Sequence, residues 1–271
     1  MAVRRGWLGV WLICFGCHWL PPLEIETQST ARQNWEKGQM AMRRGAIEEA
    51  IWCYKQGLAA DPKFTPNHLS LAAAYLQQNS PETACAHLAL YVEANPDQLL
   101  NRARYAELLL KLHRLSEART QFEQLVYNAP SQSDCANPDL IHCHGRLMEI
   151  AAESDDRYHE HLHRGIGLFL LARMRATLPA SEEDLPPESL LCKAAAELTV
   201  AHIQRPEEAR PCWYLYEVWS RLGQRQPALR RLREAEAAAP FSHLSPTERC
   251  TLLLAYERYQ TELQRGTFPP P

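Results

Sequence analysis

The feature that most constrains this chain of 271 residues is a spacing of 34 residues between equivalent positions. In the first half these positions are Gly38, Ala72 and Ala106; Ala50, Ala84 and Ala118; Tyr54, Leu88 and Phe122; and Pro62, Pro96 and Pro130. The spacing returns later at Ala194 and Ala228, Leu198 and Leu232, Ala201 and Ala235, and Pro206 and Pro240. A fixed period of this length predicts stacked supersecondary units rather than one closed core.

Each unit is predicted to be a helical hairpin. Apolar residues within a unit recur at three- and four-residue spacings, as at Leu69, Ala73 and Leu76, which is the period of a helix. The closing proline cannot continue a helix, so it sets the turn into the next unit. One hairpin leaves an apolar face exposed, and stacking on its neighbours buries that face. The sequence therefore predicts an all-α chain.

The first unit, residues 31–64, resembles a tetratricopeptide repeat (TPR). The matching residues are Gly38, Gly45, Ala50, Tyr54, Gly57, Leu58, Asp61 and Pro62. Residues 65–98 and 99–132 keep the alanine, the large residue and the proline, which makes 31–132 three hairpins. Residues 209–242 form another, with Trp219, Gly223, Ala228 and Pro240, although Tyr216 occupies a usually small position. The resemblance implies a right-handed α-solenoid of hairpins.

The middle of the chain breaks the period. Pro130 and Pro206 are two periods plus eight residues apart. We predict divergent helical repeats over 133–208, with helices near 139–153, 157–177 and 188–204 and a proline-rich, acidic loop at 179–187. One of these three helices is unpaired, and the sequence does not say which. A capping helix is expected over 243–265, starting at Ser245 and Pro246, with a disordered tail at 266–271.

The N-terminus is predicted to be an export signal. Arg4 and Arg5 precede an apolar run over 6–16, which is shorter than the ~20 residues needed to cross a bilayer. We expect residues 1–20 to be the signal and 21–30 a linker. Gly16-Cys17 resembles a bacterial lipobox, which implies lipid attachment at Cys17; an ordinary signal peptide or uncleaved anchor is the alternative. The expected location is the periplasm or cell envelope, with membrane contact only through the N-terminus.

Composition and cysteine spacing exclude several classes. Twenty-nine Lys and Arg against 32 Asp and Glu leave no basic excess, so nucleic-acid binding is not expected. Cys14 to His18 spells C-x-x-C-H, a haem-attachment pattern, but it lies inside the export signal. Cys135 and Cys143 could form a disulfide, although nothing in the sequence requires it. No cofactor is expected.

One motif favours an enzyme. His159, Glu160 and His163 satisfy H-E-x-x-H, in which two histidines on one helix face hold zinc and the glutamate acts as general base. Arg157 and Arg164 flank the motif, unlike the uncharged neighbours usual in such enzymes. A third ligand has only unsupported candidates: Glu182, Glu183, Glu188 and Glu197. A zinc hydrolase is therefore the alternative hypothesis, as is a non-catalytic metal site that also uses His142 or His144; helix-interface packing is the leading interpretation.

The family resemblance implies that the first helix of each hairpin lines a concave groove that binds protein or peptide. The matching positions are Trp35, Gln39 and Arg43; Leu69, Ala73 and Gln77; Ala103, Glu107 and Lys111; and Trp213, Glu217 and Arg221. Arg43, Lys111 and Arg221 share one hairpin position, which favours an acidic or C-terminal carboxylate segment. Solvated helix ends are the alternative. The sequence therefore predicts a non-enzymatic, exported bacterial scaffold.

Overall fold

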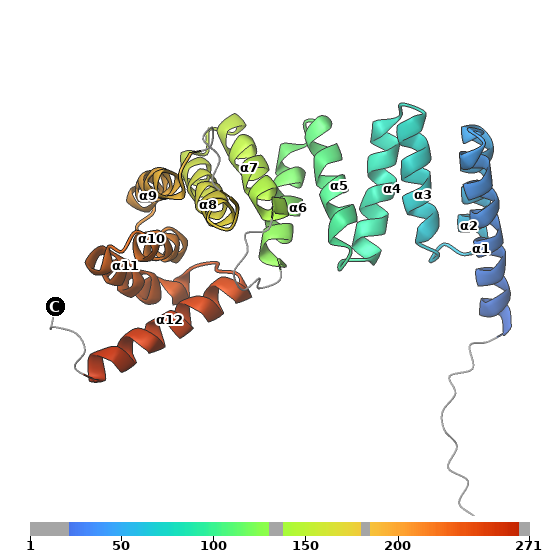
Figure 1. The fold of residues 1–271 in the computed structure, drawn as a ribbon. Helices are drawn as coiled ribbons and strands as arrows, with labels where there is room; N and C mark the ends of the chain where they lie inside the picture. The colour runs from blue at the N-terminus through green and yellow to red at the C-terminus, as the bar shows by residue number, and fades with distance from the viewer. Residues whose placement is uncertain (1–21, 130–137, 180–184, 266–271) are drawn as a thin grey trace, which may run out of the picture. The chain divides into compact units, whose positions relative to one another are not determined.

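The computed structural model describes residues 22–129, 138–179 and 185–265, and within these ranges it contains helices and no strand (Figure 1). Consecutive helices pack against one another within residues 22–94, and again within the described residues of 95–265. The all-α class and the hairpin organisation predicted from the 34-residue period are confirmed. The described helices are of the α type except for the short 3-10 helix η1 (Ala239–Phe241).

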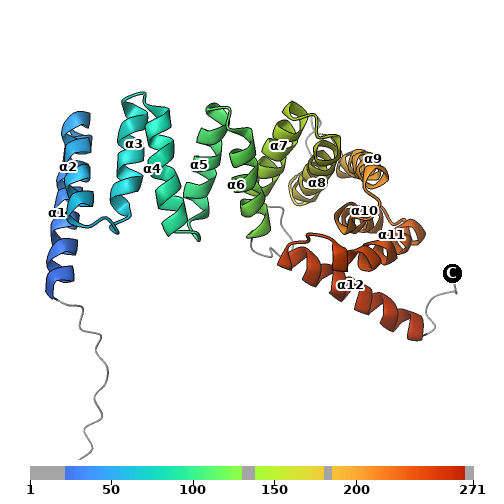
Figure 2. The same cartoon turned by 180° about the vertical axis from the view of Figure 1, so that it is seen from behind.

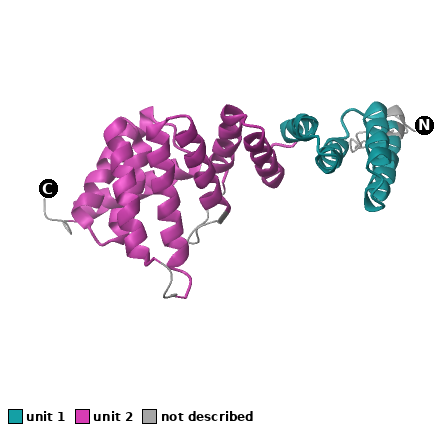
Figure 3. Cartoon of the chain, turned by 90° about the horizontal axis from the view of Figure 1, so that it is seen from above, with its two compact units in different colours: residues 1–94 teal, residues 95–271 magenta. Residues whose placement is uncertain are grey.

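The chain packs as two compact units, residues 1–94 and 95–271 (Figure 3). Unit 1 contains the helices α1 (Pro22–Arg43), α2 (Ile47–Ala60), α3 (Pro66–Gln77) and α4 (Pro81–Ala94). Helix α1 begins at Pro22, so residues 22–30 are helical rather than the predicted linker. Gly38 lies where a Cβ would come within 2.3 Å of the Tyr54 ring, which explains why α1 needs a glycine against α2.

Unit 2 contains the remaining helices. They are α5 (Leu99–Lys111), α6 (Leu115–Tyr127), α7 (Pro138–Glu153), α8 (Arg157–Arg175), α9 (Pro187–Gln204), α10 (Ala209–Arg221), α11 (Arg225–Ala238) and α12 (Pro246–Gln264). Helices α7, α8 and α9 lie close to the ranges predicted for the irregular middle. The core around them contains Leu162, Ile166 and Leu198, each almost fully buried.

The hairpin turns repeat the 34-residue period in their backbone geometry. Gly45, Asn79 and His113 follow the first helix of successive hairpins, and each has a positive φ. The next N–H in each case donates to a carbonyl five residues back, at 2.8–2.9 Å. These bonds satisfy carbonyls that the helix end would leave unpaired, and the left-handed residue makes them possible.

The same turn identifies the unpaired helix of the middle region. Asp155 and Gly223 also have positive φ and the same five-residue bonds, and they lie two periods apart. The hairpins α7–α8 and α10–α11 therefore follow the same 34-residue period. In that period α9 occupies the position of the second helix of the hairpin that would lie between them. The described residues between α8 and α9 are not helical, so α9 lacks a hairpin partner there and packs on α8 and α10.

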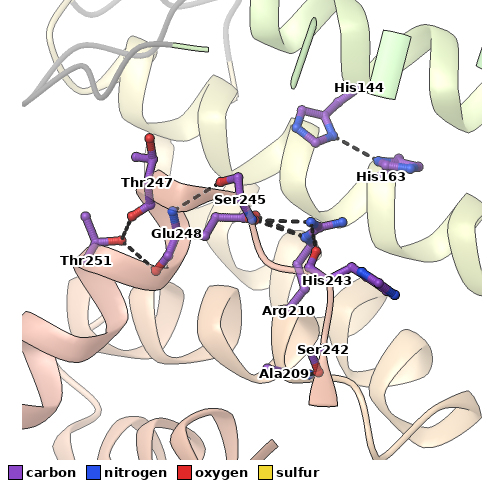
Figure 4. A network of polar contacts seen from close by, with 10 residues as sticks. All are labelled: His144, His163, Ala209, Arg210, Ser242, His243, Ser245, Thr247, Glu248 and Thr251. Carbon is purple, nitrogen blue, oxygen red and sulfur yellow. Dashed lines mark hydrogen bonds and ion pairs between the residues drawn. The ribbon is translucent and has the colours of Figure 1, made fainter. Parts of the chain in front are cut away.

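Helix α12 covers the end of unit 2 (Figures 1 and 2). Ser245 starts it with a reciprocal capping box, in which its side chain accepts from Glu248 N and the Glu248 carboxylate accepts from Ser245 N. This confirms the helix start predicted at Ser245 and Pro246. Arg210 on α10 ties α12 in place through an ion pair with Glu248 at 3.1 Å (Figure 4). Leu252 and Tyr259 are buried against α10 and α11.

Several sequence-based predictions lie outside the described residues. They concern the signal segment with Cys17, the C-x-x-C-H pattern, Cys135, Glu182 and Glu183, and the tail at 266–271. Among the described helices, none combines the length and apolar character needed to cross a membrane.

Candidate functional site

Unit 1 contains a surface pocket of about 300 Å³ between the first helices of its two hairpins. Its lining residues are Trp35, Gln39 and Met42 from α1, Tyr54 from α2, Pro66, Leu69, Ser70 and Ala73 from α3, and Tyr91 from α4. Four of the positions predicted to line a groove therefore meet at one place. The walls are mainly apolar, and an indole, an amide and a hydroxyl give them polar groups.

A short hydrogen-bond network fixes the shape of the pocket. Trp35 and Gln39 are four residues apart on α1, so their side chains leave the same face of the helix. Trp35 Nε1 and Gln39 Nε2 both donate to Ser70 Oγ, at 2.8 and 3.1 Å. The Trp35 ring also meets Phe64 edge-on, with the ring centroids 6.5 Å apart. These contacts hold the indole in one orientation before any ligand arrives.

The electrostatic setting of the pocket is neutral inside and positive at one end. Burial raises the pKa of Tyr54, so the phenol stays protonated at neutral pH. Arg43 is exposed at the end of α1, one turn beyond Gln39. No acidic partner contacts Arg43 among the described residues, whereas its neighbour Arg44 pairs with Glu49 at 3.0 Å. Gln77 is exposed at the end of α3.

In unit 2, the predicted groove residues of α5 have different surroundings. Lys111 is exposed at the end of that helix, and Ala103 is half-buried. Glu107 Oε1 accepts from Arg146 Nε at 3.0 Å and lies 2.8 Å from His142 Nε2. Burial alone would raise the pKa of Glu107, but the hydrogen bonds from His142 and Arg146 hold it below the ordinary value. Glu107 is thus a stable anion that is already partnered.

The predicted groove residues of α10 form contacts within unit 2. Trp213 was expected on a binding surface, but it is 5% exposed and packs in the core beside Tyr216, with ring centroids 5.4 Å apart. The structure therefore places it inside rather than on a groove. Arg221 forms an ion pair with Glu217 at 2.6 Å, and its guanidinium lies 5.0 Å from the centre of the Phe169 ring.

The H-E-x-x-H residues lie on α8 as predicted, but each has another partner. His159 Nδ1 is 2.7 Å from Asp156 Oδ2, and Glu160 forms an ion pair with Arg164 at 2.6 Å. His163 is buried with its Nδ1 3.0 Å from that of His144. Within the described residues, neither His159 nor His163 belongs to a group of three possible metal ligands.

His161, which lies between the two histidines of the motif, has a partner of its own. Its Nδ1 lies 2.6 Å from Glu197 on α9, away from the pair formed by His144 and His163. Four of the histidines on α7 and α8 thus join neighbouring helices, with Glu107, Glu197 and each other as partners.

The backbone turns agree with the family resemblance, because the left-handed turn residue and its five-residue hydrogen bond recur at the 34-residue period. The fold is that of a tetratricopeptide repeat protein. No family model matches the chain.

Solved TPR structures are similar to it at low identity. The first TPR of Spaghetti (RPAP3) bound to the HSP90 peptide SRMEEVD is 23% identical, with a TM-score of 0.38, over 47% of this chain and 95% of that one. MamA is 14% identical, with a TM-score of 0.39, over 78% and 92% of the two chains. The pilF protein of Pseudomonas aeruginosa is 13% identical, with a TM-score of 0.38, over 88% and 99%.

Sequence reasoning missed the residues that complete the pocket of unit 1. Ser70 is the acceptor that joins α3 to α1, and Tyr54, Met42 and Tyr91 complete the walls. Only weak sequence evidence pointed to Ser70 as a pocket residue: it is a polar residue next to the predicted groove position Leu69, on a helix whose other residues are mostly apolar. No sequence evidence pointed to Tyr91, because it belongs to a second helix and the family resemblance assigns the groove to first helices.

Proposed function

We propose that this protein is a non-enzymatic scaffold that binds an extended polypeptide segment on unit 1, with one apolar side chain in the Trp35 pocket. The observation that supports this is the pocket itself, which gathers Trp35, Gln39, Leu69 and Ala73 from the helices that line the groove in the tetratricopeptide family. A volume of about 300 Å³ suits a side chain rather than a large cofactor.

The pocket has the features of a binding hot spot. A large aromatic ring held by packing and by a hydrogen bond loses little conformational entropy when a partner docks on it. Ser70 Oγ and the Gln39 amide lie at the wall, where a peptide backbone could exchange hydrogen bonds with them. We therefore assign most of the binding energy to Trp35 and its neighbours.

We propose further that the segment is acidic or ends in a carboxylate. Arg43 stands one turn beyond Gln39, exposed and without an acidic partner among the described residues. A guanidinium pairs well with a carboxylate through two parallel hydrogen bonds. Lys111 occupies the corresponding position of its own hairpin, and its part in binding stays a prediction.

The test is selection from a displayed library of random peptides, followed by affinity measurement on the enriched peptides. We expect Trp35→Ala to weaken binding at least about tenfold, because it removes the aromatic anchor. Trp52→Ala is the matched control, since Trp52 lies on α2 with 62% of its surface exposed and does not line the pocket. Equal loss in both variants, or no enriched peptide, would contradict the proposal.

The charge preference has its own matched pair. Arg43→Glu should weaken binding of acidic peptides several-fold and lower its salt dependence, because a favourable long-range attraction becomes repulsion. Arg44→Glu makes the same charge change at a residue that already pairs with Glu49, and it should have a smaller effect. If the two variants behave alike, Arg43 does not contact the ligand.

We also propose that residues 1–20 direct export and that Cys17 carries a lipid. Support comes from Arg4 and Arg5 before a short apolar run and from the Gly16-Cys17 pair. Labelling cells with a fatty-acid probe should mark the wild type and not Cys17→Ser. Lack of label in the wild type would disprove lipid attachment, and recovery in the cytoplasm would disprove export.

A further inference from the structure

Three metal-binding side chains from three helices of unit 2 meet at one point. They are His202 on α9, Cys212 on α10 and Glu234 on α11, and one donor atom from each lies within 4.8 Å of the others. Cys212 Sγ is 3.3 Å from His202 Nδ1 and 3.8 Å from Glu234 Oε2. The other ring nitrogen, His202 Nε2, is 4.0 Å from Glu234 Oε2.

With Zn–S near 2.3 Å and Zn–N and Zn–O near 2.0 Å, neighbouring donor atoms of a tetrahedral zinc site lie about 3.3–3.6 Å apart. Cys212 Sγ lies at such a distance from His202 Nδ1 and slightly farther from Glu234 Oε2. Only one ring nitrogen of His202 can bind the ion, so the imidazole and the carboxylate must move closer together to surround it. A thiolate, an imidazole and a carboxylate together favour Zn²⁺ over Mg²⁺ or Ca²⁺, which prefer oxygen ligands alone.

The surroundings suit a metal better than a catalytic thiol. Cys212 is 1% exposed, so its sulfur offers no surface to a substrate. Burial, followed by the negative charge of Glu234, raises the pKa of Cys212 to about 12, so without metal the thiol is protonated and unreactive. His202 and Glu234 are only partly buried and leave a route for an ion to enter.

Two arginines orient the carboxylate. Arg231 Nη1 donates to Glu234 Oε2 at 2.7 Å, and Arg230 Nε donates to Oε1 at 3.0 Å. Each carboxylate oxygen can accept a hydrogen bond and still offer a lone pair to a metal, as second-sphere donors do in known sites. The Cys212 thiolate and the Glu234 carboxylate together neutralise the two positive charges of the ion. The charges of Arg230 and Arg231 are then the only ones that these residues leave uncompensated.

We propose that His202, Cys212 and Glu234 bind one Zn²⁺ ion, with water as the fourth ligand, as a clasp between α9 and the hairpin α10–α11. On binding, the Cys212 S–H bond breaks, the sulfur keeps the electron pair and bonds to zinc, and the proton passes to solvent. The clasp would join α9 to the hairpin α10–α11 in addition to the packing of α9 on α8 and α10.

The first experiment is zinc binding to the full chain, stripped with chelator and titrated with zinc sulfate. We expect one equivalent at micromolar or tighter affinity and at least about 100-fold weaker binding in Cys212→Ser and His202→Gln. Cys192→Ser is the matched control, because Cys192 is a free and exposed cysteine on α9. Unchanged binding in Cys212→Ser, or loss only in His159→Gln, would overturn the proposal.

The second experiment needs no variant and so survives a folding failure. Cobalt added to the stripped wild type should give the visible bands of a tetrahedral ion and a thiolate-to-cobalt charge-transfer band in the near ultraviolet. Zinc should also raise the melting temperature of the wild type. A cobalt spectrum without the charge-transfer band would overturn the site. Peptide binding at Trp35 is measured independently, so failure of either proposal is seen separately.

Discussion

Two histidine pairs occupy the same place in two hairpins, one in each unit. His68 on α3 faces His87 on α4 with their Nδ1 atoms 3.1 Å apart, and His144 on α7 faces His163 on α8 at 3.0 Å. The ring centroids are 5.3 and 5.2 Å apart. The two pairs have the same sequence separation, so each joins the first and second helices of its hairpin at an equivalent level.

The pairs differ in how deeply they are buried. His144 and His163 are 3% and 5% exposed, and the charge of Arg210, which pairs with Glu248 of α12, acts on both rings (Figure 4). Burial, with a smaller contribution from Arg210, lowers the pKa of His144 to about 3. His68 and His87 are only partly buried, and burial followed by the charge of His68 lowers the pKa of His87 to about 4.

The comparison shows that the hairpin sets the positions of the two paired side chains. Packing against the rest of the unit sets how deeply they are buried and therefore their pKa values. Another hairpin places Arg102 and Gln121 at this position, joined by a hydrogen bond of 2.8 Å. In α10–α11 the position holds Cys212 and Arg231. Any two side chains that satisfy each other fit between the helices, because the hairpin supplies a site for a polar pair and not for a particular one.

The largest expected effect comes from removing Arg210, which forms an ion pair with Glu248 and acts on the unit 2 pair through its charge. Arg210→Met leaves Glu248 buried without its cation, so we expect the free energy of unfolding to fall by about 3 kcal/mol. Urea unfolding at neutral pH, followed by circular dichroism, measures this. Arg225→Met is the matched control, since its ion pair with Glu262 is exposed, and it should change little. Equal effects would mean that α12 does not depend on Arg210.

The next effect is acid sensitivity of the same pair. The pKa of His144 is about 3 in the folded state against an ordinary 6.5, so the unfolded chain binds more protons below pH 6.5. Stability is therefore complete above pH 6.5 and is lost as the pH falls toward 3. Between pH 7.5 and 5 we expect a loss of about 2 kcal/mol from this histidine.

Replacing both members of the pair, His144→Leu with His163→Leu, should remove this loss while keeping the hairpin. Hydrogen exchange of α7 and α8 at the two pH values, corrected for intrinsic rates, gives the local stability. His243→Gln serves as the control, because His243 is exposed. A double variant that loses as much stability as the wild type would disprove the assignment.

The smallest effect is expected for the unit 1 pair. His68→Leu with His87→Leu should reduce acid sensitivity by less than the unit 2 replacement, because solvent reaches these rings. Nuclear magnetic resonance of the ring protons should show His87 titrating near pH 4, with the hairpin α3–α4 still folded. Titration of His87 near 6.5 would instead mean that its ring is open to water and that burial lowers the pKa only in the unit 2 pair.

The sequence by itself determined the hairpins, most helix limits and part of the pocket. Helix periodicity, turn conformation and capping depend on residues within about five positions of one another. Local interactions therefore determine the turn at Gly45, the helix cap at Ser245 and the faces of α1 and α3. The placement of Trp35 and Gln39 on one helix face follows from the same rule.

Only the tertiary structure decided which of these side chains reach solvent and which meet. Trp213 is buried because α11 and α12 pack over its face, and no local pattern encodes that cover. His202, Cys212 and Glu234 have no recognisable metal-site spacing, since three separate helices bring their donors together. Helix pairing over tens of residues sets such contacts, because the burial of apolar faces specifies which helices touch and leaves the chemistry at the contact free to vary.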